Sequence, residues 1–504
     1  MVDVDVLVIG AGSAGSVVAR RAVDAGHRVL LLEAGGPDTN PMIHDLVGMG
    51  TLWHGPEDWD YYTVPQRHAA DRCLHLPRGK VLGGSHSLNA MIWVRGAPED
   101  YDGWAAQGAK GWGWDDVLQV FRAIENYDGG SSELRGAGGP LDVVGSYPLV
   151  PVQQAIIDAA VAVGLEYNLD YNGDQLDGIS QEQITVRGGT RLNTYIAYVK
   201  PVADAPNLTI RTGAWVHRLL VEQGAVVGAE FAVNGVVEQV RAAQVVLSAG
   251  VLDSPRVLLR SGIGPADELR SLGIEVVLDL PGVGKNLHDH LLSPVIFTTE
   301  ARSVDPPQPG VSVTQTHLFW RSRTGLTVPD TQPINFSVPM YEPWMSGPET
   351  GFSLMAGMIS PKSRGAVTLA GPDPRAGLLI DLNALAEEDD LLSLEASVRQ
   401  CREIGVAGAL GADWGARELY PGPDINDDAA LRDYVRRTAI TYHHQVGTCR
   451  MGVDDASVVD SQLRLHGLDG LRVVDASVMP TVTSGNTNAP SVMIGERGAA
   501  FLLG

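Results

Sequence analysis

The clearest pattern of apolar and polar positions lies at the start of the chain. Residues 4–9 are mainly apolar and β-branched, which is typical of a short buried strand. In the next segment, up to Gly26, apolar residues recur at helical spacing on one side: Val17, Val18, Ala22 and Val23. Residues 28–32 then form a second apolar run of strand length. The pattern predicts one strand–helix–strand unit of about 30 residues.

Later stretches show other patterns. Residues 208–250 contain short β-branched runs and predict a return to sheet structure. Residues 315–380 alternate between apolar and polar positions, which suits an antiparallel sheet, and residues 386–437 contain acidic helical segments. The glycine-rich segment 127–140 predicts an exposed connection, and the proline-rich segment 302–314 a domain boundary or a lid.

Composition and charge narrow the class of protein. The 504 residues are 44% hydrophobic, enough for a large core and, at ~150 residues per domain, for about three domains or fewer large ones. There are 60 acidic residues against 37 lysines and arginines, and the formal net charge is −23. Phosphate backbones and anionic lipid surfaces repel such an acidic chain, so we expect neither nucleic acid nor a membrane as a partner.

The three cysteines, Cys73, Cys401 and Cys449, cannot build a disulfide framework or a CxxC metal site. No apolar run approaches the ~18 residues of a membrane span, and the N-terminus lacks the basic start and the cleavage site of a secretory signal. These features predict a soluble, cytoplasmic protein. The sequence leaves the oligomeric state open, with a homodimer as one alternative.

The turn between the first strand and the helix reads GAGSAG from Gly10 onward, a GxGxxG pattern in the context that dinucleotide binding requires. Gly10 allows a sharp turn, Gly12 leaves room for a pyrophosphate, and Gly15 lets the helix pack closely on the sheet. Ser13 and Ala14 belong to the helix N-terminus, where free backbone N–H groups bind phosphates.

Two further features bear on which dinucleotide is bound. Glu33, at the end of the second strand, can accept hydrogen bonds from both ribose hydroxyls and would repel a 2′-phosphate, so NADP is disfavoured. NAD and FAD both use this kind of cradle. A second glycine-rich stretch at residues 77–90 could line the redox end of one long cofactor, which favours FAD, with NAD as the alternative.

These loops and several other motifs resemble the glucose–methanol–choline (GMC) family of FAD-dependent oxidoreductases, in its choline-dehydrogenase-like or alcohol oxidase branch. The combination, order and spacing are specific, whereas any single motif would be weak. The matching segments are GAGSAG with LLEAG, PRGKVLGGSHSLNAMIWVRG at 77–96, SAGVLDSPRVLLRSGIGP at 248–265, PGVGKNLHDH at 281–290, HQVGTCRMG at 444–452, LRVVDASVMP, and GNTNAPSVMIGERGA at 485–499.

The resemblance implies a GMC oxidoreductase fold: a discontinuous α/β FAD-binding Rossmann-like domain and an α+β substrate domain with an antiparallel sheet. We expect the FAD-binding domain to comprise residues 1–150, 195–300 and 438–504. The substrate-binding domain would then comprise residues 151–194 and 301–437.

The resemblance also implies the reaction and its residues. In the family, an alcohol is oxidised by hydride transfer to flavin N5, and O₂ or another acceptor reoxidises the flavin. The histidine that opens the HxxGTC segment acts at the substrate hydroxyl, and here it is His444 rather than its neighbour His443. Its partner, just before the TNAP turn, is Asn486. A histidine can take the hydroxyl proton, and a neutral amide can hold the resulting oxygen.

Further residues are expected at the FAD by the same resemblance. Asp475 and Ala476 should lie on its ribityl and pyrophosphate side, and Asn488 and Pro490 against its ring system. Val216, at the end of a short strand, should pair its backbone with adenine. The rest of the expected cofactor-binding set comes from the two glycine-rich regions: Ala34, Val81, Gly83, Gly84, Asn89, Ala90 and Met91.

The attachment of FAD is expected to be non-covalent. In choline oxidases the histidine that binds FAD covalently directly precedes the asparagine matching Asn89. That position is Leu88 here. His86 lies two residues earlier and is the residue on which the covalent alternative depends.

The substrate is less defined than the chemistry. We expect oxidation of a primary alcohol, or alternatively a secondary one; a non-redox lyase or decarboxylase of the same family is the second hypothesis. Glu342 could form a choline site with neighbouring aromatic residues, or belong to a surface turn, and aromatic or furanic alcohols fit equally. The residues that could line the pocket or belong to the core are Phe319, Tyr341, Trp344 and Met355.

His288, Asp289 and His290 have the side chains of metal ligands. Three consecutive residues in a loop do not surround an ion on their own. We therefore expect them to serve in loop packing and hydrogen bonding, and we expect no metal.

Overall fold

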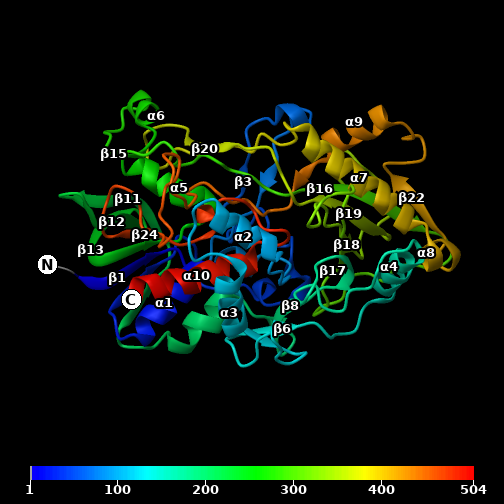
Figure 1. The fold of residues 1–504 in the computed structure, drawn as a ribbon, viewed down its shortest axis with the longest axis horizontal. Helices are drawn as coiled ribbons and strands as arrows, with labels where there is room; N and C mark the ends of the chain where they lie inside the picture. The colour runs from blue at the N-terminus through cyan, green and yellow to red at the C-terminus, as the bar shows by residue number, and fades with distance from the viewer. Residues whose placement is uncertain (1–2) are drawn as a thin grey trace.

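The computed structural model describes residues 3–504, which form two large sheets with helices around them (Figure 1). The first sheet lies on the left of Figure 1, near both termini, and the second on the right. Across the first sheet the strands are β10 (Leu208–Arg211), β2 (Val29–Leu32), β1 (Val4–Ile9), β13 (Val236–Leu247), β12 (Ala225–Val233) and β11 (Ala214–Glu222), with β24 (Leu471–Val473) also paired to β13.

The predicted strand–helix–strand unit is confirmed. Strands β1 and β2 are parallel, with Val6 opposite Val29, and helix α1 (Ser13–Asp24) connects them. The carboxyl-terminal half of β13 is parallel to β1, while its amino-terminal half pairs antiparallel with β12. Helix α10 (Asn488–Leu503) lies beside α1, so the end of the chain returns to the first turn (Figure 1).

The second sheet is antiparallel throughout, as the alternation predicts. Helices α4 (Pro151–Ala162), α7 (Glu388–Gly405), α8 (Gly408–Ala412) and α9 (Asp428–Thr438) lie around it (Figure 1). Across the sheet the strands are β22 (Ala416–Tyr420), β16 (Leu291–Thr299), β19 (Phe352–Met358), β18 (Ile334–Phe336), β17 (Thr314–Phe319) and β7 (Gly178–Gln181), with β23 (Ile440–Thr441) beside β16.

Smaller elements complete the described chain. A four-stranded sheet consists of β5 (Glu125–Tyr127), β6 (Leu141–Val144), β8 (Ile184–Arg187) and β9 (Thr190–Arg191). Three strand pairs are β3 (Tyr61–Tyr62) with β4 (His75–Leu76), β14 (Ile263–Gly264) with β15 (Leu278–Asp279), and β20 (Ala366–Leu369) with β21 (Leu378–Asp381). The remaining α-helices are α2 (Pro98–Ala106), α3 (Trp114–Ile124), α5 (Gly250–Arg260) and α6 (Ala266–Ser271), and several short 3-10 or π turns connect the elements.

The structure differs from the sequence expectations at two places. Strand β16 belongs to the second sheet, so the expected domain boundary at residue 300 falls after a strand that the second sheet needs. The segment 127–140 is exposed over most of its length, but Arg135 is buried because its guanidinium pairs with Glu125. Within residues 3–504, no helix combines the length and the apolar character needed to cross a membrane.

Candidate active site

A cavity of about 990 Å³ has walls from both large sheets. Ile9, at the carboxyl end of β1, and Val216, in β11, contribute from the first sheet. Leu292 in β16 and Ile334 in β18 contribute from the second. Ligands of open α/β sheets bind outside the carboxyl ends of the strands, and the cavity begins there.

The GAGSAG turn forms one end of the cavity. Gly10 has a φ of 101°, and a Cβ there would come within 2.3 Å of the Ser248 carbonyl oxygen. A Cβ on Gly15 would lie 1.9 Å from the Gly10 oxygen, so this glycine lets α1 pack on the turn. A Cβ on Gly12 would meet only Gly84, at 3.9 Å. Gly12 therefore leaves open space where a pyrophosphate can approach the N-terminus of α1.

Glu33 follows β2 at the same end. Its Oε2 accepts a hydrogen bond from the Ala11 N–H at 3.0 Å, and its Oε1 accepts one from the Gly35 N–H at 2.8 Å. Burial raises the pKa of this carboxyl to about 7. Each carboxylate oxygen can accept more than one hydrogen bond, so ribose hydroxyls could still be bound here.

The second glycine-rich loop lies directly against the first. A Cβ on Gly84 would come within 2.7 Å of the Gly12 Cα, so the second loop tolerates no side chain at this contact. The Ser13 hydroxyl donates to Asn488 Oδ1 at 2.7 Å and so joins the first turn to the start of α10. Asn488 Nδ2 in turn lies 3.3 Å from Nδ1 of His86.

Most of the expected cofactor-binding residues share this one cavity. Those that line it are Gly10, Gly12, Ser13, Ala14, Glu33, Ala34, Gly84, Asn89, Ala90, Val216, Asp475, Ala476 and Asn488. Five others lie behind its wall: Gly15, Val81, Gly83, Met91 and Pro490. Val216 is the third residue of a nine-residue strand rather than its end, which corrects the expectation from the sequence.

His444 and Asn486 meet in the wall of the cavity. His444 Nε2 lies 3.2 Å from Asn486 Nδ2, and His444 Nδ1 lies 3.0 Å from Nδ1 of His290. The imidazole stacks on Tyr442, with ring centroids 4.5 Å apart. Burial, assisted by nearby positive groups, lowers the pKa of His444 well below its ordinary value. The imidazole is therefore neutral near pH 7 and able to accept a proton.

A hydrogen bond from Gln332 orients the amide of Asn486. Its Oδ1 accepts a hydrogen bond from Gln332 Nε2 at 2.9 Å, so the amide nitrogen faces His444 as a donor. Gln332 Nε2 also lies 3.2 Å from Nδ1 of His317. With the Asn486 N–H pointing at His444 Nε2, that nitrogen accepts, and the ring proton sits on Nδ1, toward His290.

The other histidines of these motifs have different partners. His443 also lines the cavity, but its Nδ1 bonds to the Thr441 hydroxyl at 2.7 Å and its ring meets Trp53 edge to face. His288 bonds to the Asn286 carbonyl and accepts from the Val482 N–H. Asp289 accepts from the backbone N–H of His444. Asp289 and His290 thus both contact His444, through its backbone and its ring respectively, whereas His288 contacts other loop residues.

Beyond His444 the cavity is mainly apolar. Of the expected pocket residues, Tyr341, Trp344 and Met355 line the cavity, whereas Phe319 is buried outside it. Apolar and aromatic side chains make up this part of the wall: Met49, Ile92, Leu292, Ile334, Phe336, Met340, Met355, Ile440 and Tyr442.

Glu342 is the carboxylate at this end of the cavity, and it already has a partner. Its Oε2 forms an ion pair with Arg72 Nη2 at 2.6 Å. Trp344 is 50% exposed, and the guanidinium of Arg437 lies over its ring at 5.6 Å. The carboxylate and the indole face that a quaternary ammonium would need are thus engaged by arginines.

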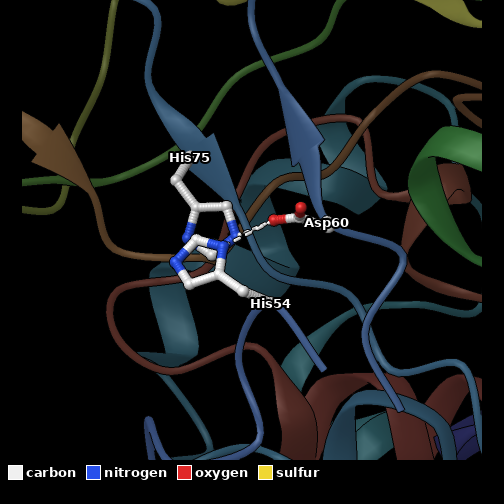
Figure 2. Close-up of side chains that lie close together, drawn as sticks. All are labelled: His54, Asp60 and His75. Atoms are coloured by element: carbon white, nitrogen blue, oxygen red, sulfur yellow. Dashed lines mark hydrogen bonds and ion pairs between the residues drawn. The ribbon is translucent and has the colours of Figure 1, made fainter. Parts of the chain in front are cut away.

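Near the opening of the cavity, His54, Asp60 and His75 lie close together (Figure 2). Asp60 Oδ1 is 2.7 Å from His54 Nδ1 and 3.1 Å from His75 Nε2. The two imidazoles stack face to face, with centroids 4.1 Å apart and 25° between their planes. A metal ion must lie in the plane of each imidazole that ligates it, and nearly parallel rings cannot meet that condition together. His54 is hydrogen-bonded to Asp60, whereas His75 Nε2 lies at ion-pair distance from the same carboxylate without a hydrogen bond.

Several neighbours of the reacting groups were not anticipated from the sequence. His290 was expected only in loop packing, and Gln332 and Tyr442 lie outside the matching motifs. Trp59 and Trp215 line the cavity near Val216, with ring centroids 6.2 Å apart. Only spatial proximity identifies these residues, because no local sequence pattern distinguishes a buried polar or aromatic residue of the core from one beside a ligand.

The residues at the cradle end fit FAD. They provide a glycine-lined approach to a helix N-terminus for the pyrophosphate, the carboxylate of Glu33 for ribose, and the indoles of Trp59 and Trp215 for adenine. A dinucleotide cradle joined through one cavity to an antiparallel sheet with a histidine and an amide defines an FAD-dependent oxidoreductase.

Comparison with known sequences agrees with this class. Family models for GMC oxidoreductases match residues 4–292 and residues 361–495. The chain therefore belongs to the GMC oxidoreductase family, and the expected fold is confirmed by solved structures of that family.

The similar proteins include an oxygen-dependent choline dehydrogenase of Brucella anthropi, 35% identical over 100% of this chain and 96% of that protein. An alcohol dehydrogenase (acceptor) of Pseudomonas putida is 36% identical over 99% of this chain and 95% of that protein. The crystal structure of pyridoxine 4-oxidase from Mesorbium loti has a TM-score of 0.94 and 36% identity, with 98% of each chain covered. Such relatives support an oxidoreductase that acts on alcohols.

Proposed function

We propose that this protein oxidises a primary alcohol to an aldehyde, with hydride transfer to flavin N5 and reoxidation of the flavin by O₂ or another acceptor. The observation that carries the proposal is the pair formed by His444 and Asn486, whose Nε2 and Nδ2 atoms lie 3.2 Å apart in the cavity wall. When bound, FAD would supply the hydride acceptor.

His444 and Asn486 each act on the hydroxyl group of the substrate. An alcohol that becomes an aldehyde loses a hydride from carbon and a proton from oxygen. His444 Nε2 takes the hydroxyl proton, because burial keeps this imidazole neutral. The Asn486 N–H donates to the substrate oxygen as negative charge develops there. The apolar wall excludes water and strengthens both interactions.

The cradle residues would hold FAD without a covalent bond. Ser13 and Ala14 present backbone N–H groups to the pyrophosphate, and Glu33 accepts from the ribose. His86, the candidate for a covalent bond, is fully buried behind the wall. Its Nε2 is engaged by the Thr185 hydroxyl at 2.9 Å, and its Nδ1 lies near Asn488. These contacts support non-covalent FAD.

The lining supports a neutral, largely apolar substrate, such as an aromatic alcohol, over choline. A quaternary ammonium is held by aromatic faces and an anionic group. Glu342 is neutralised by Arg72, and the face of Trp344 is covered by Arg437. The rest of this end presents aliphatic, thioether and phenyl groups, which favour an aryl or alkyl chain.

The test is anaerobic mixing of the purified holoprotein with benzyl alcohol or with choline, followed at the oxidised flavin absorption band. We expect bleaching with benzyl alcohol and at most slow bleaching with choline. Faster bleaching with choline would overturn the substrate class but keep the reaction. No bleaching with a wide set of alcohols would favour the lyase hypothesis.

A further inference from the structure

Arg191, at the end of β9, is a buried cation without a carboxylate partner. It is 1% exposed. The other arginines exposed by 5% or less among residues 3–504, namely Arg95, Arg135 and Arg256, each form an ion pair with Glu125, Asp170 or Asp253. No such pair involves Arg191 in this part of the chain. Arg260, which is 8% exposed, likewise donates to two carbonyls. Burying an unpaired charge is costly, and of these two arginines only Arg191 is hydrogen-bonded to a residue that lines the cavity, Asn89.

The contacts of Arg191 are oxygens of the chain. Its Nε donates to the Ile43 carbonyl at 2.7 Å, and its Nη1 donates to the carbonyls of His86 and Asn89 at 3.2 and 2.6 Å. Nη1 also lies 3.0 Å from Oδ1 of Asn89, and Nη2 is buried without a partner. Carbonyl dipoles solvate the guanidinium but do not cancel its charge. Burial lowers the pKa of Arg191 to about 9, which still leaves it protonated at pH 7.

Arg191 lies one side chain behind the cavity wall. Asn89 lines the cavity, and its Oδ1 already accepts from Arg191 and from the Met91 N–H at 2.9 Å. The amide nitrogen of Asn89 is therefore the end left to donate into the cavity. The positive charge of Arg191 also affects His86 in the same loop. Burial, together with this charge, lowers the pKa of His86 to about 3.

We propose that Arg191 is a positioning residue for the flavin: it fixes Asn89 as a donor toward the ring, and its unpaired charge raises the reduction potential of bound FAD. The inference rests on the proposed function, since it assumes that FAD occupies the cavity. Uptake of a hydride adds one negative charge to the neutral oxidised ring, so an uncompensated cation nearby favours the reduced cofactor. The hydride comes from the carbinol carbon, and the hydroxyl proton goes to His444.

The experiment measures the reduction potential of the holoprotein against a reference dye in the parent and in Arg191→Gln and Arg191→Lys. We expect the neutral variant to shift the ratio of reduced to oxidised flavin at least tenfold toward the oxidised form, which is about 30 mV for a two-electron couple. The lysine variant keeps the charge and should shift it less than threefold. Arg260→Gln is the matched control, because Arg260 also donates to two carbonyls, those of Gly371 and Ala376, but lies outside the cavity wall.

The possible outcomes distinguish the role inferred for Arg191 from the proposed function. A parent that binds FAD and is reduced by alcohol, with equal potentials in parent and Arg191→Gln, overturns the inference and keeps the proposed function. A parent that binds no FAD overturns both. Equal shifts in the lysine and glutamine variants would show a purely structural role and also overturn it. If Arg191→Gln loses its FAD, Asn89→Asp replaces it: this nearly isosteric change gives the intact Arg191 a carboxylate partner, and an unchanged potential there would contradict the inference.

Discussion

The δ nitrogens of His290 and His444 lie 3.0 Å apart, with both rings buried. One of the two atoms must carry the proton of this contact. The Asn486 amide, whose oxygen is taken up by Gln332, presents an N–H to the other nitrogen of His444. The two contacts together select the tautomer of His444 with its proton on Nδ1 and its lone pair on Nε2, where the Asn486 N–H now donates. A substrate hydroxyl that takes the place of this contact meets the form of the ring that can accept its proton.

The first prediction concerns this pair. His444→Ala should slow anaerobic flavin reduction by roughly 10²–10⁴-fold, the usual share of a positioned acid–base group. Asn486→Ala should cost less, about 10–10³-fold, because it removes one donor to the developing oxyanion. The two losses should be less than additive, since both groups act on one oxygen. Stopped-flow bleaching of the oxidised flavin band is the measurement.

His443 tests the assignment of the histidine. Its φ of 65° is in the left-handed region, so asparagine is a better replacement than alanine. We expect His443→Asn to reduce the rate by less than about tenfold, because His443 Nδ1 bonds to Thr441 and not to Asn486. A loss of reduction in His443→Asn with normal reduction in His444→Ala would reverse the assignment.

The second prediction concerns pH. The neutral imidazole of His444 is the active form, and burial lowers its pKa well below 6.5. Protonation, which removes the base, therefore begins only as the pH falls through that lowered pKa. The rate constant for flavin reduction should stay flat from about pH 6.5 upward as far as this group is concerned. A rate that falls on acidification with an apparent pKa near 6.5 or above in the parent, and becomes pH-independent in His444→Ala, would contradict the buried, neutral base.

The third prediction concerns the ribose end. Above pH 7, where the carboxyl with its raised pKa of about 7 is ionised, Glu33→Ala should weaken FAD retention, because it removes a charged acceptor worth roughly 1.5–3 kcal/mol, or about 10- to 150-fold in the dissociation constant. Glu33→Gln keeps one acceptor oxygen and should lose less. FAD dissociation constants can be measured by flavin fluorescence on dilution, with thermal unfolding of the apoproteins as the control for folding. Equal constants for parent and Glu33→Ala would remove Glu33 from the site.

Much of this arrangement could be anticipated from the sequence, for identifiable reasons. The β1–α1–β2 unit depends on local apolar spacing, and its glycines satisfy local steric demands at Gly10 and Gly15. The resemblance to GMC oxidoreductases implied that His444 and Asn486 act together, although 42 residues separate them. The membership of β16 in the second sheet could not be anticipated, because sheet partners are chosen by tertiary packing and its nine residues carry no local mark of either domain. The same holds for His290 and Gln332, whose roles arise from contacts with His444 and Asn486, far away in the sequence.

The fourth prediction concerns FAD attachment. Precipitation with trichloroacetic acid should release the flavin into the supernatant, because both ring nitrogens of His86 have other neighbours and its ring lies behind the cavity wall. Absorbance of supernatant and pellet measures the partition. Flavin that stays with the pellet of the parent but not with that of His86→Asn would establish a covalent bond at His86.

The last prediction isolates the orienting role of Gln332. Gln332→Met preserves the length of the side chain but removes the N–H that binds Asn486 Oδ1 at 2.9 Å. The amide of Asn486 is then free to turn its oxygen toward His444, which would favour the unproductive tautomer. Loss of one such hydrogen bond, about 0.5–1.5 kcal/mol, should slow flavin reduction roughly two- to tenfold.

In an Asn486→Ala background the same substitution should have almost no effect, because there is no amide left to orient. His317→Phe, which removes only the more distant contact to Gln332, should have a smaller effect than Gln332→Met in the parent. An equal loss on introducing Gln332→Met with or without Asn486 would show that Gln332 acts on the site by another route, such as packing beneath Tyr442, whose hydroxyl donates to the Gln332 carbonyl.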